Sequence, residues 1–93
     1  MEIAEYYRGK KTGKGHELRV DERQNEIVIW YLFWGEHEGI DNHHHMGVAR
    51  VRREGDAYLV GWLRDTQQRP YRNQRFANSD DLFSALDAEI AKR

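Results

Sequence analysis

The hydrophobic pattern of this chain centres on residues 27–34, where eight apolar or aromatic side chains follow one another without a polar break. In a β-strand, successive side chains point to opposite faces. The predicted strand therefore has two apolar faces, one with Ile27, Ile29, Tyr31 and Phe33 and the other with Val28, Trp30, Leu32 and Trp34. A strand of this kind is typically buried on both sides.

Two antiparallel hairpins are predicted around this strand. Leu18 and Val20 alternate with charged residues, which indicates a half-buried strand, and a short polar turn leads from it into the central strand. The turn signal at 54–56 joins a second pair of strands, whereas 35–45 and 65–77 are predicted to be polar connections. The four predicted strands span residues 16–21, 26–34, 46–53 and 57–64.

The segment 78–93 is the clearest helix. Asn78 or Ser79 can cap its start, acidic residues occupy its first turn, and Lys92 and Arg93 lie at its end. Its apolar stripe at helical spacing consists of Leu82, Phe83, Leu86 and Ile90. For residues 1–15 the pattern leaves open a flexible segment, a short helix or a short strand.

These elements predict a single α+β domain over residues 1–93, with a four-stranded antiparallel sheet of two hairpins and one C-terminal helix packed on one face. We expect the helix to cover the face of Leu59 and Leu63, because Gly61 on that face suits close approach. The opposite face would then carry Tyr58, Val60 and Trp62, together with one of the two alternating sets of side chains from the central strand.

This second apolar face needs a cover, because a monomer rarely exposes a patch formed by several aromatic side chains. A second copy of the chain would cover it in a homodimer. Residues 1–15 would cover it by folding back, or the face would receive a ligand or a protein partner. The residues assigned to this partner or dimer face are Trp30, Trp34, Tyr58, Val60 and Trp62.

Composition excludes several classes of function. With 93 residues there is room for one core and modest stability. The chain has no cysteine, which excludes disulfides, thiol catalysis and cysteine-ligated metals. Its longest apolar run is too short for a membrane span, and the first residues do not resemble a signal peptide. We therefore expect a cytoplasmic protein without membrane contact.

Histidines gather between residues 37 and 45, among several carboxylates. Imidazole and carboxylate ligands suit zinc, nickel or copper, and the candidate ligands are His37, His43 and His45. Their spacing matches no metal signature. The favoured interpretation is a solvated loop that binds divalent metal only adventitiously, with no cofactor.

A second candidate site is the basic segment 64–76, where arginine could bind phosphates and tyrosine could stack on bases. The candidate residues are Arg69, Tyr71, Arg72 and Arg75. The net charge of −1 provides no overall attraction to nucleic acid. It favours a solvated connection whose arginines pair with carboxylates. The glycine–lysine segment 8–15 lacks the spacing of a phosphate-binding loop.

No combination of residues predicts catalysis, since Ser79 and Ser84 are explained by capping and surface positions on the helix. The leading hypothesis is a non-enzymatic accessory protein that acts by protein binding or self-association through its aromatic sheet face. One alternative is a nucleic-acid-binding module that uses segment 64–76. Another is a small-molecule binder with a pocket over the tryptophans.

Overall fold

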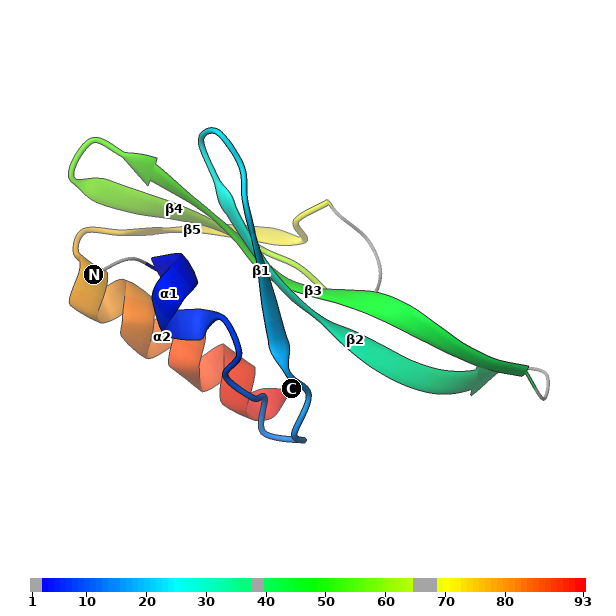
Figure 1. Cartoon of the computed structure of the whole chain (residues 1–93). Coiled ribbons are helices and arrows are strands. Elements are labelled where there is room, and N and C mark those ends of the chain that lie inside the picture. Colours follow the sequence, from blue (N-terminus) through cyan, green and yellow to red (C-terminus); the bar gives the residue numbers. More distant parts are fainter. Residues whose placement is uncertain (1–2, 38–39, 65–68) are drawn as a thin grey trace.

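The computed structural model describes residues 3–37, 40–64 and 69–93, with side chains described outside 35–43. Five antiparallel strands form one sheet in the order β1-β2-β3-β4-β5, accompanied by two helices (Figure 1). The elements are α1 (Ile3–Tyr7), β1 (Leu18–Glu22), β2 (Ile27–His37), β3 (Ile40–Glu54), β4 (Ala57–Trp62), β5 (Arg72–Phe76) and α2 (Ser79–Lys92).

The predicted α+β class, antiparallel sheet and C-terminal helix are confirmed, and the sheet has five strands rather than four. The additional strand β5 pairs with β4 from Tyr58↔Phe76 to Trp62↔Arg72. Four of its five side chains are exposed, and only Phe76 is buried. Since β5 is a polar edge strand, no apolar alternation marks it in the sequence.

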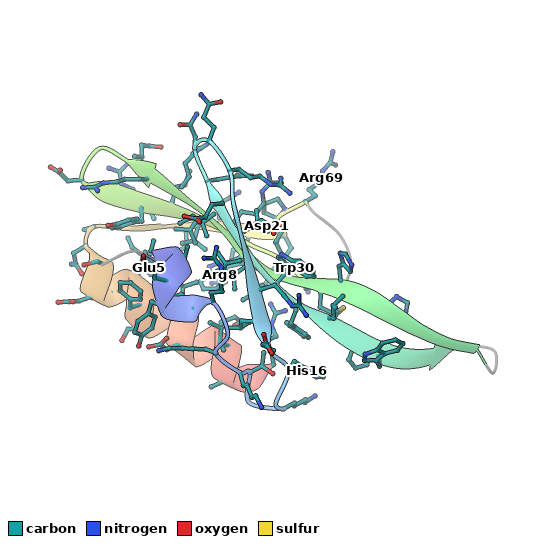
Figure 2. All side chains as sticks on the ribbon, viewed as in Figure 1. Glu5, Arg8, His16, Asp21, Trp30 and Arg69 are labelled. Carbon is teal, nitrogen blue, oxygen red and sulfur yellow. The ribbon has the colours of Figure 1, made fainter. Side chains whose placement is uncertain are left out.

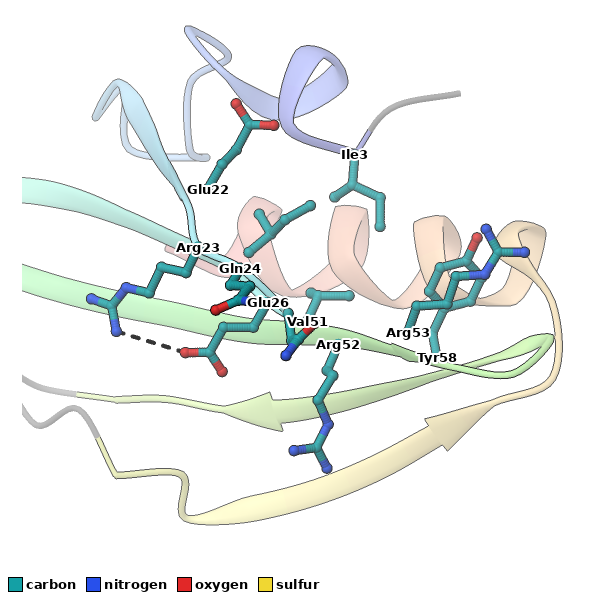
Figure 3. A pocket seen from close by; sticks show the side chains of 11 residues that line it. Ile3, Glu22, Arg23, Gln24, Glu26, Val51, Arg52, Arg53 and Tyr58 are labelled. Carbon is teal, nitrogen blue, oxygen red and sulfur yellow. Dashed lines mark ion pairs between the residues drawn. The ribbon is translucent and has the colours of Figure 1, made fainter.

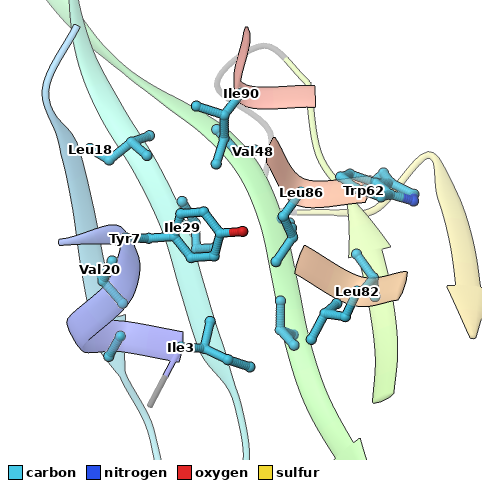
Figure 4. Packing of buried hydrophobic residues seen from close by; sticks show 14 of the residues in the cluster. Ile3, Tyr7, Leu18, Val20, Ile29, Val48, Trp62, Leu82, Leu86 and Ile90 are labelled. Carbon is cyan, nitrogen blue, oxygen red and sulfur yellow. The ribbon is translucent and has the colours of Figure 1, made fainter. Parts of the chain in front are cut away.

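Both helices pack on the same face of the sheet, which we call the helix face (Figures 1 and 4). The hydroxyl of Tyr7 in α1 donates a hydrogen bond of 2.8 Å to the Asp87 carboxylate in α2. Because α1 joins α2 in one core, residues 3–15 do not fold over the opposite, outer face of the sheet. The buried helix side chains are Leu82, Leu86 and Ile90 of α2 and Ile3, Ala4 and Tyr7 of α1.

The expectation that α2 covers Leu59 and Leu63 is wrong. The helix packs on the other face of β4, where Val60 is 0% and Trp62 2% exposed within the same core as Leu82. The cause is the strand register, because Val60 pairs with Val51, which in turn pairs with Ile27 of β2. The branched side chains of three strands thus lie on one face and give the helices a continuous apolar surface.

Gly61 does allow close approach, but of a different element. A Cβ atom at this position would lie 2.6 Å from the ring of Pro70, which belongs to the connection between β4 and β5. Gly47 likewise allows the close approach of Leu63, because a Cβ atom at position 47 would lie 2.8 Å from the Leu63 side chain. Loop and strand-end side chains therefore cover part of the outer face.

Strands β2 and β3 extend beyond their neighbours as a two-stranded ribbon, formed by residues 32–37 and 40–45 (Figure 1). Strand β1 pairs with β2 only as far as Tyr31, and β4 pairs with β3 only from Ala49. The ribbon gives the molecule its elongated shape of 48 × 23 × 22 Å. The polar loop predicted over 35–45 is therefore wrong for 35–37 and 40–45, which continue the strands.

The root of the ribbon contains a β-bulge. Ile29 pairs with Ala49 but Trp30 pairs with Gly47, so Val48 is an extra residue in β3. The carbonyl of Val48 accepts a hydrogen bond of 3.0 Å from the main-chain N–H of Leu63. Bulges bend the strand and increase its local twist, which fits the change of direction where the ribbon leaves the sheet (Figure 1).

Arg93 fixes the end of α2 to this root. Its guanidinium donates hydrogen bonds to the carbonyls of Gly47 (2.9 Å) and Leu63 (2.6 Å) and to the carboxylate of Glu89 (3.0 Å). The Arg93 side chain is only 12% exposed. The helix end, the ribbon root and the end of β4 are thus joined through one charged side chain.

Candidate functional site

The ribbon carries two of the most exposed large hydrophobic side chains in the described structure. Trp34 is 67% exposed and Phe33 is 39% exposed. Because neighbouring strand residues point to opposite sides, Trp34 lies on the outer face and Phe33 on the helix face. A two-stranded ribbon is only marginally stable in water when nothing packs on it, so these aromatic groups mark it as a surface for contact.

On the outer face, a row of apolar side chains leads from the sheet to Trp34. Trp30 lies beside β1, where the ribbon begins (Figure 2). It stacks on His45, with ring centroids 4.7 Å apart and an interplanar angle of 23°. Leu32, the register partner of His45, continues the row. Within the described structure the buried Nε1 of Trp30 has no hydrogen-bond partner, a state that costs about 1–3 kcal/mol.

On the helix face, His16 covers the other side of the ribbon root. Its ring stacks on Tyr31 at 5.0 Å and meets Phe33 edge-on at 5.8 Å. No motif around His16 predicts this contact, because it depends on the path of the chain into β1. Phe33 is therefore supported from within the molecule on one side and open to solvent on the other.

The residues predicted for the partner face divide into two groups. Trp30 and Trp34 share the outer face of β2, as the alternation predicts. Val60 and Trp62 are core residues under α2, and Tyr58 packs against the same core. The indole N–H of Trp62 is satisfied by the side-chain oxygen of Gln74 at 3.1 Å. Of these five residues, the two tryptophans of β2 therefore lie on the outer face, and the three residues of β4 lie on the helix face.

Two of the arginines predicted for nucleic-acid binding point to opposite sides of the sheet. Arg72 is the register partner of Trp62 and lies on the helix face, whereas Arg75 is opposite Leu59 on the outer face. The Arg72 guanidinium is 5.6 Å from the Trp62 ring. Arg75 forms an ion pair of 3.1 Å with Glu54.

The other two predicted residues, Arg69 and Tyr71, are exposed in the connection between β4 and β5. The guanidinium of Arg64 lies 4.3 Å from the Tyr71 ring, so one side of that ring is already occupied. The four residues thus do not form one basic, aromatic surface.

The predicted metal ligands also fall in different places. The side chains of His37 and His43 lie outside the described part of the structure. His45 is stacked on Trp30, and its neighbour His44 points to the opposite face of the ribbon. Among the described side chains, no three histidine or carboxylate groups lie close enough together to hold a metal ion.

Charge is distributed unevenly along the molecule. The outer face of the sheet carries a set of arginines, which we call the arginine face: Arg19, Arg50, Arg52 and Arg75. Arg50 pairs with Glu26, whereas Arg19 and Arg52 have no acidic partner among the described residues. The sequence over residues 35–43 contains three carboxylates and no lysine or arginine. Asp21, Glu26 and Glu54 lie on the same face as the four arginines. The outer face therefore has a small excess of positive charge, whereas residues 35–43 are acidic.

Comparisons of the chain with protein-family models, curated proteins and solved structures found no match. In the part of the chain that the structure describes, no helix is long and apolar enough to cross a bilayer. Function is therefore inferred from the geometry of the ribbon and the sheet.

Proposed function

We propose that this protein is a non-enzymatic accessory protein that acts by self-association, as a homodimer, through the outer face of its β2–β3 ribbon. The observation that carries the proposal is the 67% exposure of Trp34 on a ribbon that extends past its neighbouring strands. A tryptophan exposed to this degree, continuous with Leu32 and the Trp30–His45 stack, is typical of the centre of a protein–protein contact.

A second copy of the chain is the partner that the charges favour. The acidic segment 35–43 of one copy complements the arginine face of another, and a two-fold arrangement would form this contact twice. Trp34 would bury about 150 Å² in this contact. The charged surfaces would supply the rest of the roughly 800 Å² per partner found in stable complexes.

Native mass spectrometry and light scattering of untagged protein over a range of concentrations test this proposal. Trp34→Ser should raise the dimer dissociation constant by about 30-fold or more, as expected for a central aromatic residue. Tyr71→Ser is the matched control, because Tyr71 is 44% exposed but lies away from the ribbon. This control should dimerise like the wild type.

The dimer should also weaken as salt rises, because opposite charges contribute to the contact. A wild-type protein that stays monomeric at its highest soluble concentration would refute self-association. A Trp34→Ser variant that dimerises as tightly as the wild type would refute the ribbon as the interface.

A further inference from the structure

A cleft of about 600 Å³ lies at the end of the sheet opposite the ribbon, between the β1–β2 turn and the β3–β4 hairpin (Figure 3). Residues 22–26 of the turn form one wall, and residues 51–53 with Tyr58 form the other. Ile3 of α1 adjoins the cleft on the helix face. The volume falls in the range of about 300–1,000 Å³ that is usual for small-molecule sites.

The cleft exists because the two hairpins separate at this end. Strand β2 begins at Ile27, opposite Val51, but β3 continues to Glu54. Along this edge, residues 52–54 have β4 on one side and no strand on the other within the described structure. An open strand edge presents main-chain N–H and C=O groups, so the cleft offers hydrogen-bonding groups as well as side chains.

The carboxylates in the cleft are already neutralised by neighbouring cations. Glu22 pairs with Arg8 at 3.3 Å. Glu26 pairs with both Arg50 and Arg23. Since Arg8 and Arg50 lie outside the cleft lining, these pairs leave the remaining arginines of the lining without a balancing negative charge.

These remaining arginines are Arg52 and Arg53, whose side chains point to opposite faces of β3. Arg52 lies on the outer face with its register partner Leu59, and Arg53 lies on the helix face with Tyr58. Arg52 extends away from Ile3 (Figure 3) and has no acidic partner among the described residues. Arg53 donates through Nε to the carbonyl of Gly55 at 3.1 Å and lies 5.8 Å from the ring of Tyr58. No hydrogen bond within the described structure uses its terminal nitrogens.

The cleft also has apolar lining on the helix face. Val51 and Ile3 are 2% and 8% exposed, and Ile27 and Tyr58 are partly buried against the core. This apolar surface lies on the same face as the Arg53 guanidinium, so it suits a ligand with an apolar body and one anionic group.

We propose that this cleft binds a small organic carboxylate with an apolar body. The carboxylate lies at the open β3 edge, where the terminal nitrogens of Arg53 donate to it, and the apolar body lies against Ile27 and Tyr58 on the same face of the sheet. Guanidinium groups match a carboxylate through paired N–H donors. This site does not depend on dimerisation through the ribbon.

Titration of ¹⁵N-labelled protein with octanoate, followed by amide chemical shifts, tests the proposal. Octanoate should shift the amides of Gln24, Asn25 and residues 52–54. Arg53→Gln should weaken binding by about 10–100-fold, the loss expected for a hydrogen bond to a charged group. Arg69→Gln is the matched control, because Arg69 is an exposed arginine outside the cleft.

Octanol and octylammonium, run against the wild type, separate the anionic requirement from hydrophobic binding without any substitution. Both should bind at least about tenfold more weakly than octanoate. Octanol that binds as tightly as octanoate, shifts confined to the ribbon, or an Arg53→Gln variant that binds octanoate as tightly as the wild type would overturn the proposal. The same titration on Trp34→Ser should be unchanged, which keeps this site distinct from the dimer interface.

Discussion

Arg93 offers a direct test of how the ribbon is held to the rest of the molecule. Arg93→Ala removes a charged donor from the carbonyls of Gly47 and Leu63 and from the Glu89 carboxylate. Hydrogen bonds to charged groups contribute about 1.5–3 kcal/mol each. Water will replace part of this set near the surface, so we expect a loss of about 2–4 kcal/mol in the free energy of unfolding.

A loss of this size is a large fraction of the stability of a small domain, about 5–15 kcal/mol. With a urea m-value of about 1–3 kcal/mol/M, the unfolding midpoint should fall by roughly 1–2 M, with m unchanged. Tryptophan fluorescence and far-ultraviolet circular dichroism should report the same midpoint. Lys92→Ala, next to Arg93 but exposed, is the control and should change stability by less than about 0.5 kcal/mol.

Arg93→Lys should lie between the wild type and Arg93→Ala, because an ammonium group keeps the charge but lacks the fork that reaches both carbonyls. Amide hydrogen exchange at the ribbon root should accelerate in Arg93→Ala. A midpoint of Arg93→Ala within error of the Lys92→Ala control would refute the assigned role of Arg93.

Three further substitutions test local features. Burial raises the pKa of the Tyr7 hydroxyl, and its hydrogen bond to Asp87 and the charge of Asp87 raise it further. The contribution of this group to the free energy of unfolding is therefore fully present below the unfolded pKa of about 10. Above that pH the contribution falls by up to about 1.4 kcal/mol per pH unit. Urea unfolding between about pH 8 and pH 11 should show that Tyr7→Phe removes this part of the decline. Asn78→Ala removes the helix cap and should cost about 1 kcal/mol in urea unfolding. Gly13→Ala would place a Cβ atom 2.0 Å from the Ala91 carbonyl oxygen, and thermal unfolding should show a loss of about 1–3 kcal/mol.

Each of these has a result that contradicts it. An alkaline decline of the same slope in Tyr7→Phe would mean that other groups cause it. An Asn78→Ala variant of wild-type stability would mean that the cap contributes nothing. An unchanged melting temperature for Gly13→Ala would mean that the last turn of α2 adjusts freely.

The sequence predicted the elements whose apolar periodicity matches their burial. Leu82, Leu86 and Ile90 recur at helical spacing and form the buried stripe of α2. The alternation within residues 27–34 likewise identified both faces of β2. Strand β5 could not be found in this way, because its place depends on main-chain pairing with β4 rather than on its polar side chains.

The principal error was the face of the sheet that α2 covers. The sequence of one strand cannot predict this face, because it depends on how the strands pair. Periodicity shows that Val60 and Trp62 share one side of β4, but not which side of β2 they join. That relation is set by the pairing of Val60 with Val51 and by the bulge at Val48. Hence two of the five predicted partner-face residues, Trp30 and Trp34, lie on the outer face and three contribute to the core.

The ribbon was missed for a related reason. Its strands contain glycine, histidine and carboxylates, which are typical of a loop, and its ladder depends on cross-strand hydrogen bonds. The exposed Trp34 was identified from the sequence, whereas the cleft between the hairpins was not. The cleft forms where pairing stops, at Ile27 and Val51, and no residue pattern marks that point.

The order of the strands has a consequence for the folding pathway. Every strand pairs with its neighbour in sequence, so the sheet can form through short loop closures, which are fast. The contacts of Tyr7 with Phe83 and Asp87 instead join residues 76 and 80 positions apart, and such closures carry a greater entropic cost. The five-stranded sheet should therefore be largely formed in the transition state, and α1 should pack on α2 after it. Tyr7→Phe should then accelerate unfolding and leave the folding rate nearly unchanged. The contact between α1 and α2 would thus form late in folding and slow the unfolding of the native state.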